Sequence, residues 1–308
     1  MRFPVLLVLA LAAVPATLPA QGPAASIGDT TTVGVRLPDQ RDARQAPGNH
    51  LYDKWQFSAS AASLILSTTV RVDPDSGGEG TELNSEDDLG LAKTVLRPRF
   101  AVRWRPGHRH ELEASWVFVN RKGDRTLVDS IEVGDTSFSA GVELLSQFRN
   151  DQIALVYRWA FHATETSQIG LGIGLGAQIL TLKFDALAGG ASGGDTATVQ
   201  KSVKKKLVGP TGSLGAYGRW QLGEHWNIDA DLRGIYAKIS TITVWDVEGG
   251  AALRYWLNHT WGFEAGYGIG VYDVKIDVSS GDALINYDFA GKVRYSNQNV
   301  RLGVNLAL

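Results

Sequence analysis

The sequence predicts an all-β chain that forms a transmembrane, antiparallel, up-and-down β-barrel of about ten strands, with eight or twelve as alternatives. Apolar and polar residues alternate with period two over most of the chain, whereas helical periodicity is not sustained anywhere. The 308 residues include 35 Gly and 9 Trp at a mean hydropathy of -0.08, an unusual composition for a soluble enzyme. The N-terminus also looks like an export signal.

An export signal and a separate lead-in precede the predicted barrel. An apolar run, 3–13, follows the basic second residue and is itself followed by a stretch rich in Pro and Ala. This run is shorter than the roughly 18 apolar residues that a spanning helix needs. We therefore predict a cleaved signal peptide over 1–20, with Ala16 as an alternative cleavage point, an irregular periplasmic lead-in over 21–50, and the barrel over 51–308.

Composition excludes several classes of function. The chain has no Cys, so it carries no disulfide scaffold, no thiolate nucleophile and no cysteine metal site. Its 30 basic and 32 acidic residues give a formal charge of -2, which does not favour nucleic acid. His108 and His110 lie close together but lack further ligands at a suitable spacing, and we interpret them as solvated turn residues. We predict no cofactor and no metal site.

Two stretches of the chain follow one plan, and each predicts a hairpin with two strand segments around three turn residues. Pairing the segments places Arg219 opposite Asp229 in one hairpin and Arg254 opposite Glu264 in the other, because side chains alternate along a strand. One face of each hairpin is aromatic and aliphatic, and the other carries these charges. In a membrane barrel the apolar face meets lipid and the charges lie inside.

The first predicted strand has an apolar face that changes phase. Trp55 and Phe57 occupy one parity, whereas Leu64 and Leu66 occupy the other. A β-bulge near 62–63 would keep both sets of side chains on the lipid side, and we predict one there.

Two strands joined by a tight turn at 106–107 come next. The first, 96–105, alternates apolar residues with arginines, and the second, 111–118, carries Glu111 and Glu113 at alternate positions. Arginines at period two cannot face hydrocarbon, so we place them inside, opposite the carboxylates.

A polar stretch with a short strand near 127–133 leads to one long predicted strand, 142–163. The strand after it has Gly at every second position from Gly170 to Gly176, and a similar ladder recurs over 266–270. Two interpretations stay open. The glycines leave room inside for large side chains of other strands, or they permit strong curvature.

Short turns and longer links alternate along the chain, which predicts the orientation of the barrel. Short turns, typical of the periplasmic end, lie near 106–108, 164–167, 223–225 and 258–260. Longer or more polar links, typical of the outer end, lie near 73–88, 121–140, 187–201, 245–248 and 279–282. This alternation gives about ten strands with both ends of the barrel chain in the periplasm.

The last predicted strand changes phase as well. Its outward residues change from Val293 and Tyr295 to Val300 and Leu302 across 296–299. We predict a bulge in one long strand, and a further turn is the alternative.

The predicted interior is charged, and aromatic residues mark the lipid interface. The interior network comprises Arg97, Arg99, Arg103, Arg105, Glu111, Glu113, Arg158, Arg219, Asp229, Asp231, Arg233, Arg254, Glu264, Asp288, Lys292 and Arg294. The interface aromatics are Trp104, Trp159, Trp220, Trp226, Tyr255 and Trp261. Paired charges would fill a narrow lumen and lock the strands, whereas an open lumen would form a narrow, weakly anion-preferring path.

At this point the chain resembles the small bacterial outer-membrane β-barrels of the porin-like superfamily, and more narrowly a family of such barrels with no assigned biochemical role. The resemblance rests on Arg109-His110-Glu111-Leu112, on the segment 131–136, on Tyr157-Arg158-Trp159 and on the Gly-rich strand that follows. It covers roughly 51–308 and carries no catalytic residue. Such barrels usually end in Phe, so an end at Leu308 implies a weaker signal to the assembly machinery.

These observations predict a non-enzymatic protein of the cell outer membrane. It would be a structural or surface-interaction protein, or a narrow channel. The alternative is a barrel enzyme that hydrolyses lipid or protein at the surface, which would use His with Ser or Asp near the outer rim. We expect outer-membrane lipids, lipopolysaccharide and the assembly machinery as partners, and we expect no nucleic acid. An acidic loop, 73–88, and lysines over 201–206 are interpreted as solvated surface.

Overall fold

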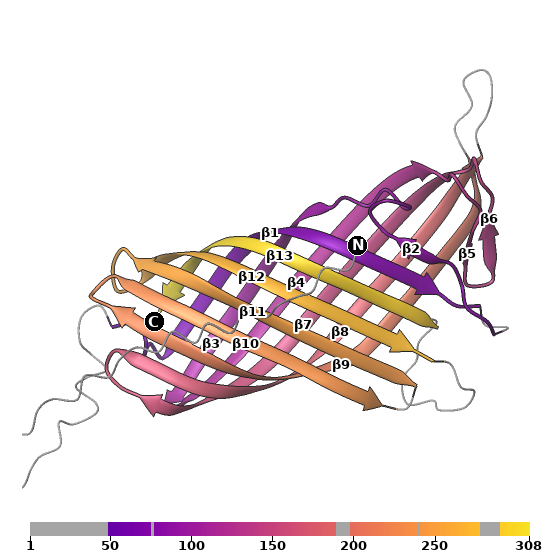
Figure 1. Cartoon of the computed structure of the whole chain (residues 1–308). Coiled ribbons are helices and arrows are strands. Elements are labelled where there is room, and N and C mark those ends of the chain that lie inside the picture. The colour runs from indigo at the N-terminus through magenta and orange to yellow at the C-terminus, as the bar shows by residue number, and fades with distance from the viewer. Residues whose placement is uncertain (1–48, 75–76, 189–197, 240, 278–289) are drawn as a thin grey trace, which may run out of the picture. The chain divides into compact units, whose positions relative to one another are not determined.

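The computed structural model describes residues 49–74, 77–188, 198–239, 241–277 and 290–308. Within these ranges the chain is a closed antiparallel barrel of ten long strands, which confirms the predicted fold class (Figure 1). No helix among these residues is long and apolar enough to cross a membrane. The predicted signal peptide and most of the predicted lead-in lie outside the described residues.

Ten long strands form the wall in chain order, and β13 pairs with β1 to close it. They are β1 (Trp55–Val72), β3 (Thr94–Gly107), β4 (His110–Thr126), β7 (Glu143–Ala163), β8 (Ser167–Ala188), β9 (Thr198–Leu222), β10 (Trp226–Ile239), β11 (Ile242–Trp256), β12 (Trp261–Ile276) and β13 (Gly291–Ala307). The short strand β2 (Glu82–Asn84) pairs with β1, and β5 (Ile131–Val133) pairs with β6 (Thr136–Phe138) in a separate hairpin.

Tight turns gather at one end of the barrel, the turn end, and long connections gather at the other, the loop end. The turns after β3, β7, β9 and β11 lie where the sequence predicts them. In barrels of this type the turn end is periplasmic. One link was placed wrongly. β10 ends at Ile239 and β11 begins at Ile242, so residues 245–248 lie inside β11, where alternation continues without a break.

The predicted bulge in β1 is wrong. β1 pairs with both β3 and β13 without a register shift. Leu64, which is 2% exposed, and Leu66 therefore point into the barrel, whereas Ile65 between them points outward. The apolar pattern changes parity because the interior itself becomes apolar toward the loop end, not because the strand is distorted.

The same explanation applies to β13. It is one strand, as preferred from the sequence, but its pairing with β12 and β1 shows no bulge at 296–299. Val293 and Tyr295 face the interior, where they belong to or pack against an apolar cluster. Their neighbours on the outer face, Lys292 and Arg294, consequently lie outside the barrel. The segment 278–289, which contains Asp288, lies outside the described residues.

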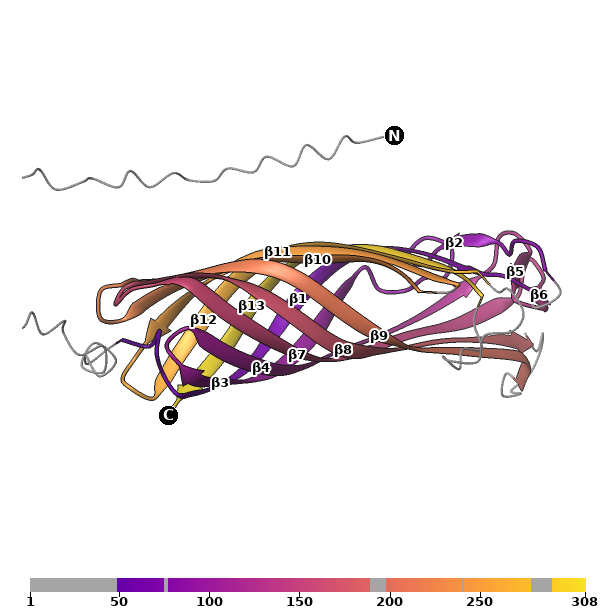
Figure 2. The same ribbon diagram turned by 90° about the horizontal axis from the view of Figure 1, so that it is seen from below.

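Apolar side chains fill the barrel interior near the loop end, and we call them the loop-end cluster. Val70, Leu144, Phe148, Leu182, Phe184, Val274 and Val293 contribute from the wall, and Leu83, Leu89, Leu91, Leu127, Ile131, Val133 and Phe138 contribute from the connections. All are buried. The two outer connections and the β5–β6 hairpin are thereby packed onto the barrel as a cap, which lies at the right of Figures 1 and 2.

The wall is incomplete between β9 and β10. Their pairing runs from Trp226↔Leu222 to Gly234↔Leu214 and then stops, so residues 198–213 of β9 and 235–239 of β10 are not paired with each other. β9 stays paired with β8 and β10 with β11 over their lengths. Figures 1 and 2 show the two strands diverging toward the loop end. We call this interruption the seam.

Cysteine cross-linking checks the seam, because the chain has no native Cys. Thr211→Cys with Ala237→Cys would face each other if the register continued. We expect this pair to remain largely uncross-linked by an oxidant in vesicles, since a disulfide needs Cα atoms within about 7 Å.

The matched control lies where the strands are paired. Ala216→Cys with Leu232→Cys occupies a register pair of the same two strands and is expected to cross-link readily. Equal cross-linking of both pairs would show that the pairing of β9 with β10 continues through the seam in the membrane and would contradict the seam.

Candidate functional site

Seven arginines and four carboxylates cross-link the interior of the turn-end half, and we call this set the ion-pair layer. Its members are Arg99, Arg103, Arg105, Arg158, Arg219, Arg254, Arg301, Glu111, Glu113, Asp229 and Glu264. They come from eight of the ten strands, β3, β4, β7, β9, β10, β11, β12 and β13. The charges predicted to lie inside thus form one connected network rather than separate hairpin pairs.

Glu111 is the centre of the network. Its carboxylate accepts hydrogen bonds from Arg219 Nη1 at 2.5 Å and Nη2 at 2.8 Å, from Arg158 Nη1 at 2.8 Å and from Arg105 Nε at 2.9 Å. Arg103 Nε lies 3.1 Å away as well. β4 and β9 are separated in the wall by two strands, so the contact between Glu111 and Arg219 crosses the lumen.

The remaining carboxylates join neighbouring arginines. Glu113 contacts Arg99 at 2.6 Å and Arg158 at 2.9 Å. On the other side, Arg254 contacts Asp229 at 2.7 Å and Glu264 at 3.1 Å. Such pairs are tolerated in a buried position because each carboxylate contacts at least two arginines.

Both predicted hairpins have the predicted register. Asp229 pairs with Arg219 and Arg254 pairs with Glu264 across the turns. The direct contact between Arg219 and Asp229 is long, at 3.6 Å, because Arg219 extends to Glu111 instead. The pair positions follow from the sequence, but the partner that each side chain selects does not.

The Gly ladders make room for this layer. A Cβ on Gly170 would lie 2.6 Å from the Tyr217 ring, and one on Gly268 would lie 2.9 Å from the amide of Asn299. Tyr217 in turn packs against the guanidinium groups of Arg158 and Arg219, at 5.9 and 5.1 Å from the ring centroid. At Gly170 and Gly268 the structure therefore supports the interpretation that the glycines accommodate large neighbours, and at Gly170 a Cβ would also clash with the backbone oxygen of Trp159.

The last residues of the lead-in pack against side chains at the turn end of the barrel. The His50 ring stacks on Trp256 with centroids 3.8 Å apart, and Trp256 is fully buried. Leu51 is buried beside them, and Arg105 donates to the backbone carbonyl of Asp53. The layer and this segment together place buried charged and aromatic side chains in the turn-end half of the lumen.

Some predicted members of the network lie elsewhere. Arg233 binds Glu248 at 2.5 Å, closer to the loop end, and Asp231 lies on the lumenal face of β10 without an ion pair to any described residue. Arg97 lies on the lumenal face of β3 and likewise has no ion pair within the ranges that the structure describes. Lys292 and Arg294 were predicted inside but face outward, because β13 has no bulge; Arg294 is exposed.

Sequence reasoning missed three participants. Arg301 and Glu248 occupy lumenal positions on β13 and β11, and simple alternation from their neighbours could have found them. Gln56 accepts from Arg103 at 2.5 Å. The sequence gives only a weak indication of this contact, since a single amide side chain in an apolar stretch does not indicate a buried hydrogen-bond partner.

The predicted interface aromatics lie on the outer face near the turn end. Trp159, Trp226 and Trp261 are exposed, and Trp226 packs against Tyr255 with centroids 4.7 Å apart. Trp104 stacks with Trp55 of the neighbouring strand, and Trp220 lies on the same outer belt. Aromatic rings at this level are typical of a membrane–water interface.

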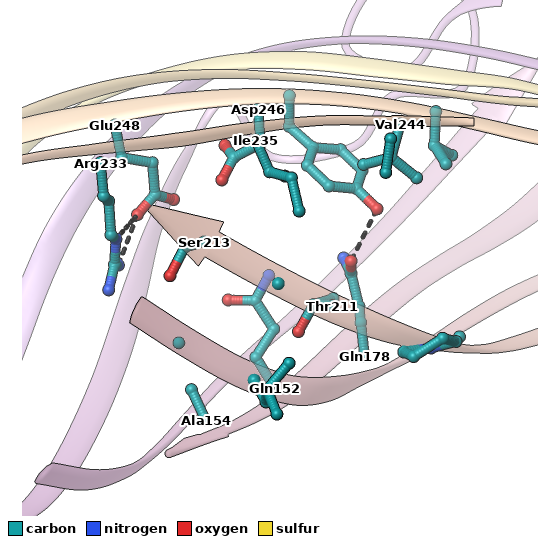
Figure 3. A pocket seen from close by; sticks show the side chains of 18 of the residues that line it. Gln152, Ala154, Gln178, Thr211, Ser213, Arg233, Ile235, Val244, Asp246 and Glu248 are labelled. Carbon is teal, nitrogen blue, oxygen red and sulfur yellow. Dashed lines mark hydrogen bonds and ion pairs between the residues drawn. The ribbon is translucent and has the colours of Figure 1, made fainter. Parts of the chain in front are cut away.

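A cavity of about 320 Å³ lies in the loop-end half, behind the seam, and we call it the side cavity. Its apolar lining includes Val156, Ile235, Ile242, Val244, Val274 and Tyr295, and its polar lining includes Gln152, Gln178, Thr211, Ser213, Arg233, Asp246 and Glu248. Figure 3 shows Arg233 paired with Glu248 at one side. The Tyr272 hydroxyl donates to Gln178 at 2.7 Å.

Comparison with known proteins agrees with this architecture. No family model and no curated protein matches the chain. The outer membrane protease OmpT from Escherichia coli is similar in structure, with a TM-score of 0.51 and 10% identity over 85% of this chain and 98% of that one. The protein has the fold of a small outer-membrane barrel.

Two further solved structures align over much of the chain at lower similarity. They are Ail of Yersinia pestis, with a TM-score of 0.31, 9% identity and coverage of 81% of this chain and 97% of that one, and the P. putida toluene transporter TodX, with a TM-score of 0.33, 10% identity and coverage of 82% and 89%.

All six histidines lie at or near the turn end. His50 precedes β1, and the others lie in or beside the turns after β3, β7, β9 and β11: His108, His110, His162, His225 and His259. No group of three or more potential metal-binding side chains lies close together within the described ranges. The loop end therefore carries no imidazole that could act as a general base.

Proposed function

We propose that the protein is a non-enzymatic, non-conducting barrel of the outer membrane that acts through its capped loop end. The observation that carries the proposal is the double closure of the lumen. The ion-pair layer crosses the turn-end half, where Glu111 and Arg219 are almost fully buried, and the loop-end cluster packs the interior near the loop end beside the side cavity. An axial path for solutes would have to displace both.

The cap supports a role in surface interaction. β2 and the β5–β6 hairpin are held by buried apolar side chains rather than extending freely. A surface that is ordered before binding loses less conformational entropy when a partner binds. The distribution of the histidines supports the non-enzymatic part of the proposal, since hydrolysis at the cell surface would need a base at the opposite end from where they lie.

Planar-bilayer recording tests the closed lumen. We expect the refolded full-length barrel to give no measurable single-channel current, because charged pairs and packed apolar side chains leave no continuous water path. A known porin refolded and inserted in the same way shows that insertion and detection work. Steady unitary currents from this protein would contradict the proposal and favour the narrow channel.

A further inference from the structure

The seam lies in the part of the wall that faces lipid. Leu214, the last paired residue of β9, is 63% exposed, and Leu232 of β10 is 47% exposed. The loop-end part of the seam is more polar, since Lys206 and Lys204 follow Val208 on the outer face of β9 and Lys238 follows Tyr236 on β10. The opening therefore starts within the apolar belt and continues to the level where lipid head groups begin.

The sequence of β9 disfavours pairing with β10 beyond Leu214. Pro210 has no N–H to donate, and a proline inside a sheet is confined to edges and bulges. Gly209 and Gly212 flank it and weaken the strand further. A Cβ on Gly212 would lie 2.9 Å from Ile235 Cδ1, so the side chain of Ile235 occupies space next to β9 instead of a paired backbone.

Unpaired strand edges cannot remain in dry hydrocarbon, because no solvent satisfies their N–H and C=O groups. They are tolerated where they line a water-accessible cavity. The seam edges fit that condition, since Thr211, Ser213, Ile235 and Ala237 from both edges line the side cavity. The cavity thus adjoins the seam and is lined by residues of both unpaired edges.

The cavity has one acceptor that the protein leaves unused. The buried Oδ1 of Asp246 has no hydrogen-bond partner within the part of the chain that the structure describes. The adjacent Glu248 is occupied by Arg233 at 2.5 and 3.1 Å, and Gln178 accepts from Tyr272. A buried acceptor without a donor is unfavourable, and a bound molecule with a donor group would remove that penalty.

We propose that the side cavity binds a small, uncharged amphiphile that enters from the outer-leaflet interface through the seam. Its apolar body would contact Val156, Ile242, Val244 and Val274, and its hydroxyl would donate to Asp246. A volume of about 320 Å³ is at the lower end of the range of small-molecule sites, roughly 300 to 1,000 Å³. An uncharged molecule is favoured over a cation on the route through the apolar belt, because burying an unpaired charge in hydrocarbon is costly.

Protection of a single engineered Cys tests the proposal in the full chain reconstituted in lipid nanodiscs. Ala154→Cys places a thiol in the cavity lining, and the chain has no other Cys. We expect a maleimide to alkylate this thiol slowly through the seam, and we expect 4-hexylphenol to slow the reaction further in a saturable way. Hexylbenzene, which lacks the hydroxyl, is expected to protect at roughly three- to tenfold higher concentration, the effect of one hydrogen bond.

Two further variants and one control test whether the probes protect the thiol by binding in the side cavity. Asp246→Leu removes the acceptor and should abolish the preference for 4-hexylphenol over hexylbenzene. Gly209→Phe fills open space in the cavity, since a Cβ there meets no atom within 4 Å, and should abolish protection by both probes. Ala265→Cys, exposed on the outer face of β12, reports simple partitioning into lipid and should show no saturable protection.

Three outcomes would overturn the proposal. Complete absence of alkylation at Ala154→Cys would show that the seam is closed. Equal protection by both probes would exclude the contact with Asp246. Equal protection of Ala154→Cys and Ala265→Cys would show partitioning without a site. None of these outcomes bears on conductance, so the proposed function is tested separately.

Discussion

Replacing Glu111 by Gln is expected to lower the free energy of unfolding by about 3 to 5 kcal/mol, the range found when one partner of a buried ion pair is removed. Glu111 is 3% exposed and contacts Arg103, Arg105, Arg158 and Arg219. Gln preserves the shape of the side chain but removes the negative charge that these cations share. Urea unfolding of the barrel in lipid vesicles, followed by tryptophan fluorescence, measures the change.

Glu143→Gln is the matched control. Glu143 lies at the loop-end terminus of β7 and is exposed, so the same substitution there should change stability by no more than about 0.5 kcal/mol. An equal effect of both substitutions, or a Glu111→Gln barrel as stable as the unaltered one, would show that the ion-pair layer does not hold the strands together.

A double variant separates two causes of the loss. If uncompensated positive charge dominates, adding Arg219→Met to Glu111→Gln should recover part of the stability, because one buried cation is removed with its partner. If the lost hydrogen bonds dominate, the second substitution should destabilise further, since Arg219 also contacts Asp229.

The architecture was predictable because it depends on local patterns. Alternation gives the strands, and loop length gives the order of turns and links, so ten strands with turns after β3, β7, β9 and β11 follow from the sequence. The hairpin register followed for the same reason, since a three-residue turn fixes which residues face each other.

The composition of the interior was less predictable. Period two shows that a strand has two faces, but it does not show which face meets lipid when both are apolar. Around Leu64, Ile65 and Leu66, consecutive residues are apolar because one side meets lipid and the other forms a small buried cluster with Ala62, against which Val95 and Tyr295 pack. Apparent phase changes occur in both β1 and β13, which are neighbours across the closure. An apolar stretch of lumen explains both with one cause, whereas bulges would need two.

Contacts across the lumen could not be predicted either. The contact of Glu111 with Arg219 depends on the tilt and closure of the barrel, which bring β4 and β9 together over two intervening strands. The seam left a sequence signal that was not used. Pro210 stands in the middle of a long strand, and proline is typical of a strand edge.

Replacing Arg121 by Met is expected to release the cap while leaving the ion-pair layer intact. The Arg121 side chain is fully buried and donates to Glu86 Oε1 at 2.5 Å, to Thr68 Oγ1 at 2.8 Å and to the backbone carbonyl of Ala92 at 3.0 Å. Met can pack on the Phe148 ring, over which the Arg121 guanidinium lies at 5.9 Å, but it leaves the carboxylate of Glu86 without its cation. Removing one partner of such a pair costs about 3 to 5 kcal/mol.

This loss should appear locally, because Glu86 lies in the connection between β2 and β3 and not in the wall. Limited proteolysis in vesicles is expected to cut within 82–93 in the Arg121→Met protein and to leave the unaltered protein intact. The barrel itself is expected to remain folded in both proteins, as measured by its heat-dependent mobility on a gel. Arg149→Met, which removes an exposed arginine paired with Asp151, is the control and should not change cleavage.

The double variant Arg121→Met with Glu86→Leu decides whether the charge pair or simple packing holds the cap. Both replacements are apolar, and Arg121 lies beside Phe148 of the loop-end cluster, so removing the two charges together is expected to restore resistance to the protease. Continued cleavage would mean that the bonds from Arg121 to Thr68 and Ala92 are what fix the connection. If the Arg121→Met protein were cleaved no more than the unaltered protein, Arg121 would not hold the connection between β2 and β3 on the barrel. That result would also contradict the inference that the cap is ordered before any partner binds.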